Sequence, residues 1–400
     1  MAELVATTRR LDGDVDLLAA AGADGVLFER GRGGLAGRGV ALRVRCDAVA
    51  EALGAIAVDD EVGVPGCGPV AFGALPFHPD ALPAAELVVP SVVWGRAEDG
   101  TRWVTTIGDA DVPSPVPPSA ARRSAPGALR LAPSRPAAEW CDVVAEATAA
   151  IAGSGGSLEK VVLAREVIVE ADEPFDRMAI LGRLRAGYPG CFVTHVDGFV
   201  GASPELLVSR AGDVVRAQPM AGTAPRGGDP ASDARLAASL LANPTYRHEH
   251  QVTIDEVHDT LLGWCSYVDF EPEPSVVAVA NLQHLATLVE GRLSRPAPSV
   301  LELVAALHPT PAVAGRPRRA AIDWIAAHEG FDRGRYAGTV GWVDAAGNGQ
   351  WAVSVRCAEI DGRTARVFAG NGIVAGSDPD TELVETQIKL QALLGALLRP

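Results

Sequence analysis

The order of the predicted elements is the sequence feature that most constrains the fold. After residue 136, strand patterns come in runs separated by single helical patterns, rather than in strict strand–helix alternation. Such runs predict an α+β architecture, because a parallel βαβ sheet requires strict alternation. The predicted strands are 160–170, 191–196, 199–209, 213–218, 335–343, 350–360 and 363–370, and the predicted helices are 137–153, 175–187, 232–263, 299–307, 316–328 and 380–397.

The first third of the chain has a different character. Residues 1–107 alternate short β-like runs with Gly- and Pro-rich turns, and 111–136 then holds seven prolines without a usable periodicity. The Pro-rich segment predicts an exposed connection. Two domains hinged there are one possibility. We favour one domain over 1–400, in which 1–110 supplies core strands and 137–400 forms the rest, because the first third has few helices to cover a sheet.

Composition excludes several classes of protein. A chain of 400 residues with 48% hydrophobic content can fill a sizeable core. The formal charge of −15 argues against a nucleic-acid partner, and any anionic ligand would need a locally positive pocket. The six cysteines are scattered without zinc spacing, which predicts reduced thiols in a cytoplasmic protein. We see no signal peptide and no apolar stretch long enough to cross a membrane.

The C-terminal segment 377–390 concentrates charge on one side of a predicted helix. Ser377, Asp378 and Pro379 read as a helix start, and Glu382, Glu385 and Lys389 follow at i, i+3 and i+7, which is one helical stripe. Two carboxylates suit a hard cation, and a nearby ammonium can attract an anionic substrate. The alternative is a solvated helix face with one favourable Glu–Lys pair.

The segment QWAVSVRCAEI (350–360) reads as a strand with one unusual face. Alternation places Ala352, Ser354 and Ala358 on the same face as Arg356, so small side chains surround a single guanidinium. A guanidinium binds a carboxylate through two parallel hydrogen bonds. Tyr336, in the preceding predicted strand, could add a hydroxyl donor to the same anion. The alternative is an arginine on a solvent-exposed face.

Two further charged residues begin predicted strands. Lys160 stands at the start of an apolar strand, and Glu205 follows a Ser-Pro turn that opens another. A charged strand end in water is the commoner arrangement. If a cleft encloses these residues, however, either one is a candidate for acid–base catalysis.

The predicted helix at 246–257 supplies Glu249 between His248 and His250. A His-x-His pair could suggest zinc, but HExxH is absent and neighbouring helical positions diverge. Glu249 as a further carboxylate for Mg²⁺ is the better interpretation. The Gly-Asn-Gly at 370–372 indicates a hairpin turn in the first place and a ligand-binding loop only in the second.

Together these motifs resemble the chorismate-utilising enzymes, most closely the isochorismate synthases. The likeness is strong over 139–397 and loose over the first third. The motifs that carry it occur in the family's order, and they are KVVLAR (160–165), GASPELL (201–207), PMAGTAPRG (219–227), RHEH (247–250), LQHLAT (282–287), LHPTPAVAG (307–315), YAGTVGW (336–342), VRCAE (355–359), AGNGIV (369–374) and ELVETQIK (382–389).

The resemblance implies a fold like that of anthranilate synthase component I, with two large packed β-sheets flanked by helices in α/β/β/α layers. It also implies that chorismate is the substrate and Mg²⁺ the cofactor. Lys160 looks like the base that activates water for attack at C2, and Glu205 like the acid that protonates the departing C4 hydroxyl. Glu249 and Glu385 resemble the Mg²⁺ ligands, with Glu382 holding a metal-bound water.

The remaining site residues follow from the same resemblance. Arg356, helped by Tyr336, would bind the enolpyruvyl carboxylate of chorismate, and His284 would lie near the reacting ring. The residues expected to line the pocket are Gly222, Thr223, Gly370 and Lys389, together with Ala312. We expect no membrane and no glutaminase subunit, and the family leans toward monomers.

Local motifs separate the relatives. Ala221 stands where the aminodeoxychorismate synthases carry a nucleophilic lysine, which excludes that route. HPTPAVAGRPR (308–318) differs from the motif of anthranilate synthases, and Ala312 replaces a threonine of salicylate synthases. We therefore expect the reaction to stop at isochorismate, which feeds siderophores, salicylate-derived metabolites or menaquinone. The alternatives are a salicylate synthase, which also eliminates pyruvate, and a catalytically silent relative that binds a small anion or a partner protein.

Two positions depart from the family pattern. Tyr246 replaces an acidic residue that many relatives carry three positions before the metal-ligand glutamate, and Asn371 adds a polar side chain where the family has AGAGI. Both departures concern the expected metal site.

Overall fold

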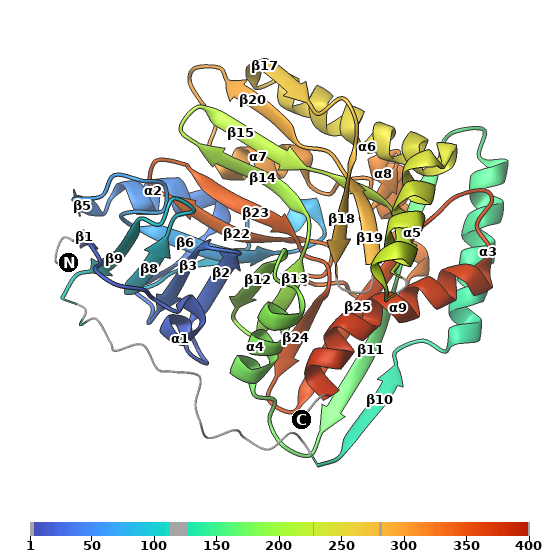
Figure 1. The fold of residues 1–400 in the computed structure, drawn as a ribbon, viewed down its shortest axis with the longest axis horizontal. Helices are drawn as coiled ribbons and strands as arrows, with labels where there is room; N and C mark the ends of the chain where they lie inside the picture. Colours follow the sequence, from blue (N-terminus) through green and yellow to red (C-terminus); the bar gives the residue numbers. More distant parts are fainter. Residues whose placement is uncertain (1–3, 110, 112–126, 227, 280–281, 399–400) are drawn as a thin grey trace.

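Three β-sheets form the framework of the computed structural model, which describes residues 4–109, 111, 127–226, 228–279 and 282–398 (Figure 1). Within these residues the sheets contain 13, nine and three strands. Neighbouring strands are antiparallel throughout the described pairings, except that β1 and β5 are parallel. The predicted α+β class with two large sheets is therefore confirmed.

The 13-stranded sheet joins the two ends of the chain. It contains strands from the first 110 residues and strands from the last 50. In order, its strands are β10 Leu129–Pro133, β11 Lys160–Ala171, β25 Thr364–Ile373, β24 Cys357–Asp361, β13 Phe199–Ser203, β12 Phe192–Val196, β2 Val26–Arg30, β3 Gly33–Arg38, β8 Val92–Arg96, β9 Arg102–Ile107, β1 Val5–Arg10 and β5 Ala57–Asp60, with the short β21 Gly315–Arg316 paired to β11.

The other two sheets are smaller. The nine-stranded sheet has the order β17 Cys265–Phe270, β20 Val289–Leu293, β15 Val214–Gln218, β14 Leu206–Ala211, β23 Gly349–Val353, β22 Thr339–Asp344, β6 Val70–Leu75, β7 Glu86–Val89 and β4 Leu42–Arg45. The three-stranded sheet has the order β16 Met220–Pro225, β19 Leu282–Ala286 and β18 Ser275–Val279.

Alternating side chains let central strands of the large sheet, such as β2, contribute to two cores. In β2, Phe28 belongs to the apolar cluster shared with Phe72 of the nine-stranded sheet, whereas Leu27 belongs to a second cluster under helices. Successive side chains of a strand point to opposite faces, so one sheet can serve both layers. The two large sheets therefore pack face to face through the first cluster.

Helices cover the outer faces (Figure 1). Residues of α1, α4 and α9 share the second cluster with the 13-stranded sheet, and residues of α2, α6 and α7 share the first cluster with the nine-stranded sheet. The helices are α1 Leu17–Ala21, α2 Val49–Gly54, α3 Ala137–Gly153, α4 Arg177–Gly187, α5 Pro230–Ala242, α6 Pro244–Leu262, α7 Val300–Leu307, α8 Arg318–His328 and α9 Pro379–Leu398.

The predicted helix over 232–263 is wrong in one respect, because it is two helices that meet at Asn243. The Asn243 side chain accepts hydrogen bonds from the backbone N–H groups of Thr245 and Tyr246, and Pro244 occupies the first helical turn of α6. An Asn cap followed by Pro begins a new helix, since Pro lacks the N–H that a continuing helix would need.

Two predicted strands are also wrong, because each of them is split between the two large sheets. Residues 199–209 form β13 in the 13-stranded sheet and β14 in the nine-stranded sheet, with Pro204 and Glu205 between them. Residues 350–360 form β23 and β24, which again belong to different sheets. Apolar alternation continues through both breaks because each sheet buries its strand.

The Gly-Asn-Gly at 370–372 does not form the predicted hairpin turn. All three residues lie inside β25, where Gly370, Asn371 and Gly372 pair with residues 162–164 of β11. A Cβ atom on Gly370 would lie 2.9 Å from the Tyr336 hydroxyl, so the glycine serves a close approach rather than a turn.

Most of the predicted Pro-rich connection, 111–136, lies outside the described residues. Its described end differs from the prediction, since Leu129–Pro133 forms β10 and pairs antiparallel with β11. The six cysteines are free, as the sequence predicts. None of the helices in the described ranges combines the length and apolarity of a membrane span.

Candidate active site

The site lies where chain segments pass from one large sheet to the other. Glu205 precedes β14 in one crossing, and Arg356 precedes β24 in the other. The crossings run side by side, because Val353 N–H donates to the Glu205 carbonyl at 3.1 Å and Ala202 N–H donates to the Arg356 carbonyl at 3.0 Å. The chain enters β24 from the other sheet, so β24 pairs with β25 only from Thr364 to Val367. The 13-stranded sheet is therefore open beside the rest of β25.

Arg356 adopts a backbone conformation that is uncommon for a residue with a side chain. Its φ is +50°, in the left-handed region. Non-glycine residues there cost of order 1–3 kcal/mol and cluster at functional sites. The crossing thus fixes the direction of the guanidinium at the expense of local strain.

Glu205 is buried next to positive charges. The residue is 6% exposed. Burial raises the pKa of Glu205 to about 7, although a hydrogen bond from Met220 N–H and the charges of Arg356 and Lys160 oppose the rise. A carboxyl group with this pKa carries a proton for much of the time at neutral pH, as a general acid requires.

Lys160 begins β11 and forms an ion pair with Glu249 of α6. Burial opposes the charged form of Glu249, but the Lys160 ammonium outweighs burial and holds the pKa of Glu249 below its ordinary value. The neighbouring strand leaves room for the lysine, because a Cβ atom on Gly372 would lie 2.4 Å from Lys160 Cε.

The second lysine occupies the facing helix. Lys389 of α9 forms an ion pair with Glu385 at 2.7 Å, one helical turn away, and donates to the Gly370 carbonyl at 3.1 Å. Burial lowers the pKa of Lys389, while Glu385 opposes this shift. The charge of Lys389 also helps to hold the pKa of Glu249 below its ordinary value.

Glu382 is held by neutral donors instead of a lysine. The Ser377 hydroxyl donates to Oε1 at 2.9 Å, and the Asn371 amide donates to Oε2 at 3.0 Å. Burial raises the pKa of Glu382 despite these hydrogen bonds. The predicted helix start is confirmed nearby, because the Asp378 carboxylate accepts a hydrogen bond from Thr381 N–H at 2.9 Å.

The charges of three carboxylates act on Tyr246 of α6. Burial raises the pKa of the Tyr246 hydroxyl, and Glu385, Glu249 and Glu382 each add to the rise. In the described residues no three acidic, His or Cys side chains stand together as a ready-made metal cage. Mg²⁺ does not require one, since it binds through one or two carboxylates together with water and substrate oxygens. The donor set fits that pattern.

A chain of hydrogen bonds holds the Arg356 guanidinium. Arg356 Nη2 lies 2.9 Å from His284 Nε2, and His284 Nδ1 lies 3.2 Å from the Gly222 carbonyl and 3.3 Å from the Thr223 hydroxyl. A guanidinium only donates, so Nε2 must accept and the ring proton must be on Nδ1. Burial lowers the pKa of His284 well below its ordinary value, and Arg356 adds to the effect, which keeps the ring neutral.

Tyr336 forms part of the apolar floor near β25. It lies in the turn before β22, not in a strand as predicted, and its ring stacks on Phe368 with centroids 5.0 Å apart. Burial raises the pKa of Tyr336, so the hydroxyl stays protonated and can donate. Ala312 is partly buried in the turn after α7. None of the contacts described for the chain joins it to the charged groups, so its place in the pocket stays a prediction.

The structure thus brings most of the predicted residues into one neighbourhood. The lysine content of the sequence also points to this neighbourhood. Of the 35 basic residues, only Lys160 and Lys389 are lysines, and both lie in the site. Asn371, expected near the metal site only as a departure from the family pattern, contacts Glu382 and Lys389.

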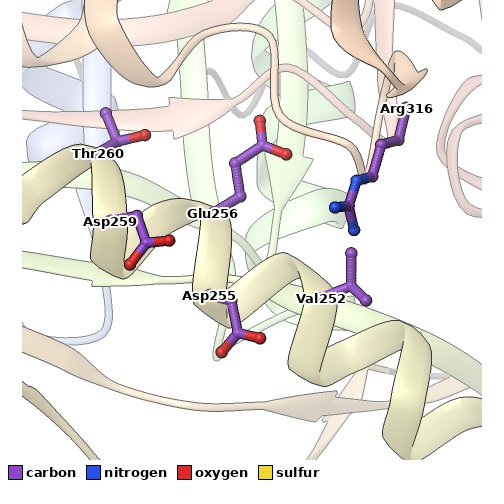
Figure 2. A pocket seen from close by; sticks show the side chains of 6 residues that line it. All are labelled: Val252, Asp255, Glu256, Asp259, Thr260 and Arg316. Carbon is purple, nitrogen blue, oxygen red and sulfur yellow. The ribbon is translucent and has the colours of Figure 1, made fainter.

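A separate surface pocket of about 560 Å³ lies farther along α6. Figure 2 shows helix residues on one side and Arg316 reaching toward Val252 from the other. Three carboxylates against one guanidinium would repel a dianion, and none of the predicted site residues lines this pocket. The residues that line it are Val252, Asp255, Glu256, Asp259, Thr260 and Arg316.

Residues 116–398 match the family described as chorismate binding enzyme. MenF of Mycobacterium tuberculosis is 41% identical over 345 residues, covering 83% of this chain and 87% of that protein. The isochorismate synthase DhbC of Bacillus subtilis is 38% identical, with coverage of 82% and 81%. The structure of MenF from Escherichia coli is similar with a TM-score of 0.84 at 24% identity, covering 99% and 95%, which shows the shared fold.

Proposed function

The chain belongs to the family of chorismate-binding enzymes, and on this premise we propose that it converts chorismate to isochorismate. The observation that carries the proposal is the buried Glu205, which stands beside Lys160 and Arg356 with a pKa raised to about 7. Similarity to isochorismate synthase DhbC over most of both chains supports the same reaction.

The reaction exchanges one hydroxyl group for another. Water adds to C2 of the ring, the double bonds shift, and the C4 hydroxyl leaves as water, so substrate and product have the same composition. Lys160 takes the proton of the attacking water, and Glu205 gives a proton to the leaving hydroxyl. General acid–base groups of this kind typically contribute about 10²–10⁴-fold in rate.

Lys160 has to be neutral before it can take a proton. In the arrangement described it forms a charged pair with Glu249, and this pair has to separate when chorismate binds. A Mg²⁺ ion held by Glu249 and Glu385, with Glu382 near a bound water, would bind the ring carboxylate and compete with both lysines for their carboxylates.

Arg356 binds the enolpyruvyl carboxylate of chorismate in this proposal. The neutral His284 restrains one edge of the guanidinium, and the rest of the fork is left for a bidentate contact. Tyr336 adds a protonated hydroxyl. The pocket lining consists of Gly222, Thr223, Gly370, Lys389 and Ala312. The cationic groups offset the net charge of −15 at the one place where a dianion binds.

The test is direct. Purified protein is incubated with chorismate and MgCl₂, and the products are separated and identified by mass spectrometry. We expect isochorismate, its loss when EDTA is added, and its loss in Lys160→Ala. Salicylate together with pyruvate would support a salicylate synthase instead. Unchanged chorismate with a raised melting temperature would support the silent binding protein, and either result contradicts the proposal.

A further inference from the structure

Asn371 lies in β25 between two glycines that face the site. Positions 370 and 372 point toward Tyr336 and Lys160, and the alternation of the strand turns the Asn371 side chain toward α9, which carries Glu382 and Lys389. The residue is only 2% exposed. A buried amide in this place needs partners for its carbonyl and for both of its N–H groups.

The amide finds all of these partners on α9. Nδ2 donates to the Glu382 backbone carbonyl and to Glu382 Oε2, each at 3.0 Å, and Oδ1 accepts from Lys389 Nζ at 2.5 Å. The reversed amide would place N–H groups against an ammonium and a carbonyl oxygen against a carboxylate. The partners therefore fix the orientation of the amide.

The Asn371 amide also separates the Lys389 ammonium from the Glu382 carboxylate on α9. The three N–H groups of Lys389 have three acceptors, namely Glu385 Oε1, the Gly370 carbonyl and Asn371 Oδ1. Among the ion pairs of the described chain, Lys389 pairs with Glu385 and not with Glu382, which accepts from Ser377 and Asn371. A neutral side chain thus stands between the ammonium and the second carboxylate.

We propose that Asn371 is a positioning residue that keeps the Lys389 ammonium away from Glu382, so that this carboxylate remains free to assist a divalent cation. The inference rests on the proposed function, because that function assigns the cation to this cluster. Without the amide, Lys389 is free to pair with Glu382 as well as with Glu385. A carboxylate paired with an ammonium competes poorly as an acceptor for Mg²⁺ or its water.

The experiment measures Mg²⁺ binding without substrate. The probe is MgCl₂, and the readout is the rise in melting temperature with Mg²⁺ concentration, which gives an apparent dissociation constant by linkage. Asn371→Ala should weaken Mg²⁺ binding about tenfold, a change of the size that loss of hydrogen bonds to charged groups produces. The same substitution in a Lys389→Met background should change the constant less than about twofold, because no ammonium is left to be released.

An equal loss in both backgrounds would assign Asn371 a merely structural role, and no loss with Lys389 present would also overturn the inference. Asn371→Ser is made in parallel, since its short hydroxyl cannot span the two partners, and it answers the question if the alanine variant does not fold.

The matched control is Asn348→Ala. Its amide lies in the turn between β22 and β23, where it donates to Asp344 at 3.0 Å and accepts from Gly212 N–H at 2.7 Å. It should lower the melting temperature without changing the response to Mg²⁺. Turnover of chorismate by the unmodified protein is measured in the same preparation. If that protein binds Mg²⁺ but makes no isochorismate, the proposed function fails and the role of Asn371 still stands or falls on the binding data.

Discussion

At the scale of single residues, the fold treats its two proposed catalytic groups differently. Glu205 is buried without an ion pair among the described residues, and burial raises its pKa to about 7. Lys160 is instead stabilised as an ammonium by Glu249. The proposed acid therefore carries a proton for much of the time at neutral pH before substrate arrives, whereas the proposed base has to be released from its ion pair when substrate and cation bind.

Replacing Glu205 by Gln tests the acid directly. The amide keeps the shape of the side chain but cannot give up a proton, so we expect kcat to fall about 10²–10⁴-fold while chorismate still binds. Steady-state kinetics and a binding titration separate the two effects. Glu290→Gln is the control, because Glu290 pairs with Arg216 on the surface, and it should match the unmodified enzyme. Turnover within threefold of normal in Glu205→Gln would remove Glu205 from this role.

The raised pKa of Glu205 also predicts how activity depends on pH. The protonated form is the active acid, so kcat should fall as the pH rises through about 7. Stability follows the same direction, since a carboxyl whose pKa is raised on folding stabilises below its ordinary value of 4.5 and loses that contribution as the pH rises through about 7. In Glu205→Gln the unfolding midpoint should vary less with pH across this window, and an unchanged pH dependence would contradict the assignment.

At the scale of elements, the sequence motifs select candidate side chains that the structure brings together, whereas the local patterns misplace the strands that carry them. The pattern at 350–360 predicts one strand because apolar residues alternate without a break, yet β23 and β24 lie in different sheets. Both sheets bury their strands, so nothing in the alternation marks the crossing. The role of Arg356 stays a prediction, and its position depends on a left-handed backbone conformation that the pattern does not predict.

The close packing of β25 against Lys160 leads to a prediction at the same scale. A Cβ atom on Gly372 would meet Lys160 Cε at 2.4 Å, so Gly372→Ala should displace the lysine and lower kcat about 10–100-fold. Gly376→Ala is the matched control in the following turn, where an added Cβ meets nothing within 4 Å. Kinetics and melting curves of both variants decide the matter, and equal activity of the two would refute the close approach.

At the scale of the whole molecule, long-range pairing could not be predicted from local patterns. Strands β6, β7 and β4 from the first third complete the nine-stranded sheet, while β2 and β3 extend the 13-stranded one. Local periodicity gives the strands but not their partners, which lie up to hundreds of residues away. The α/β/β/α layers came from the family resemblance and are confirmed.

A buried ion pair joins segments that are far apart in the sequence. Arg333 and Glu329 pair at 2.6 Å, Arg333 donates to the carbonyls of Val313 and Val162, and Glu329 accepts from Ala164 N–H. Removing one partner leaves an uncompensated buried charge, so Glu329→Gln should lower the free energy of unfolding by about 3–5 kcal/mol. Denaturant unfolding measures this loss.

The control for this prediction is an exposed pair with the same spacing in α8. Arg319 and Asp323 lie four residues apart on the surface, so Asp323→Asn should leave the unfolding midpoint unchanged. Equal midpoints for Glu329→Gln and Asp323→Asn would show that the buried network does not hold the core strands and loops together.

The measurement that tests the account most directly is turnover of chorismate in water enriched in oxygen-18. If Lys160 activates a water molecule for attack at C2, every isochorismate molecule formed must carry one oxygen atom from the solvent, and the label must be at C2. Mass spectrometry of the product detects it. Isochorismate without solvent oxygen, or no isochorismate at all, would contradict the proposed reaction.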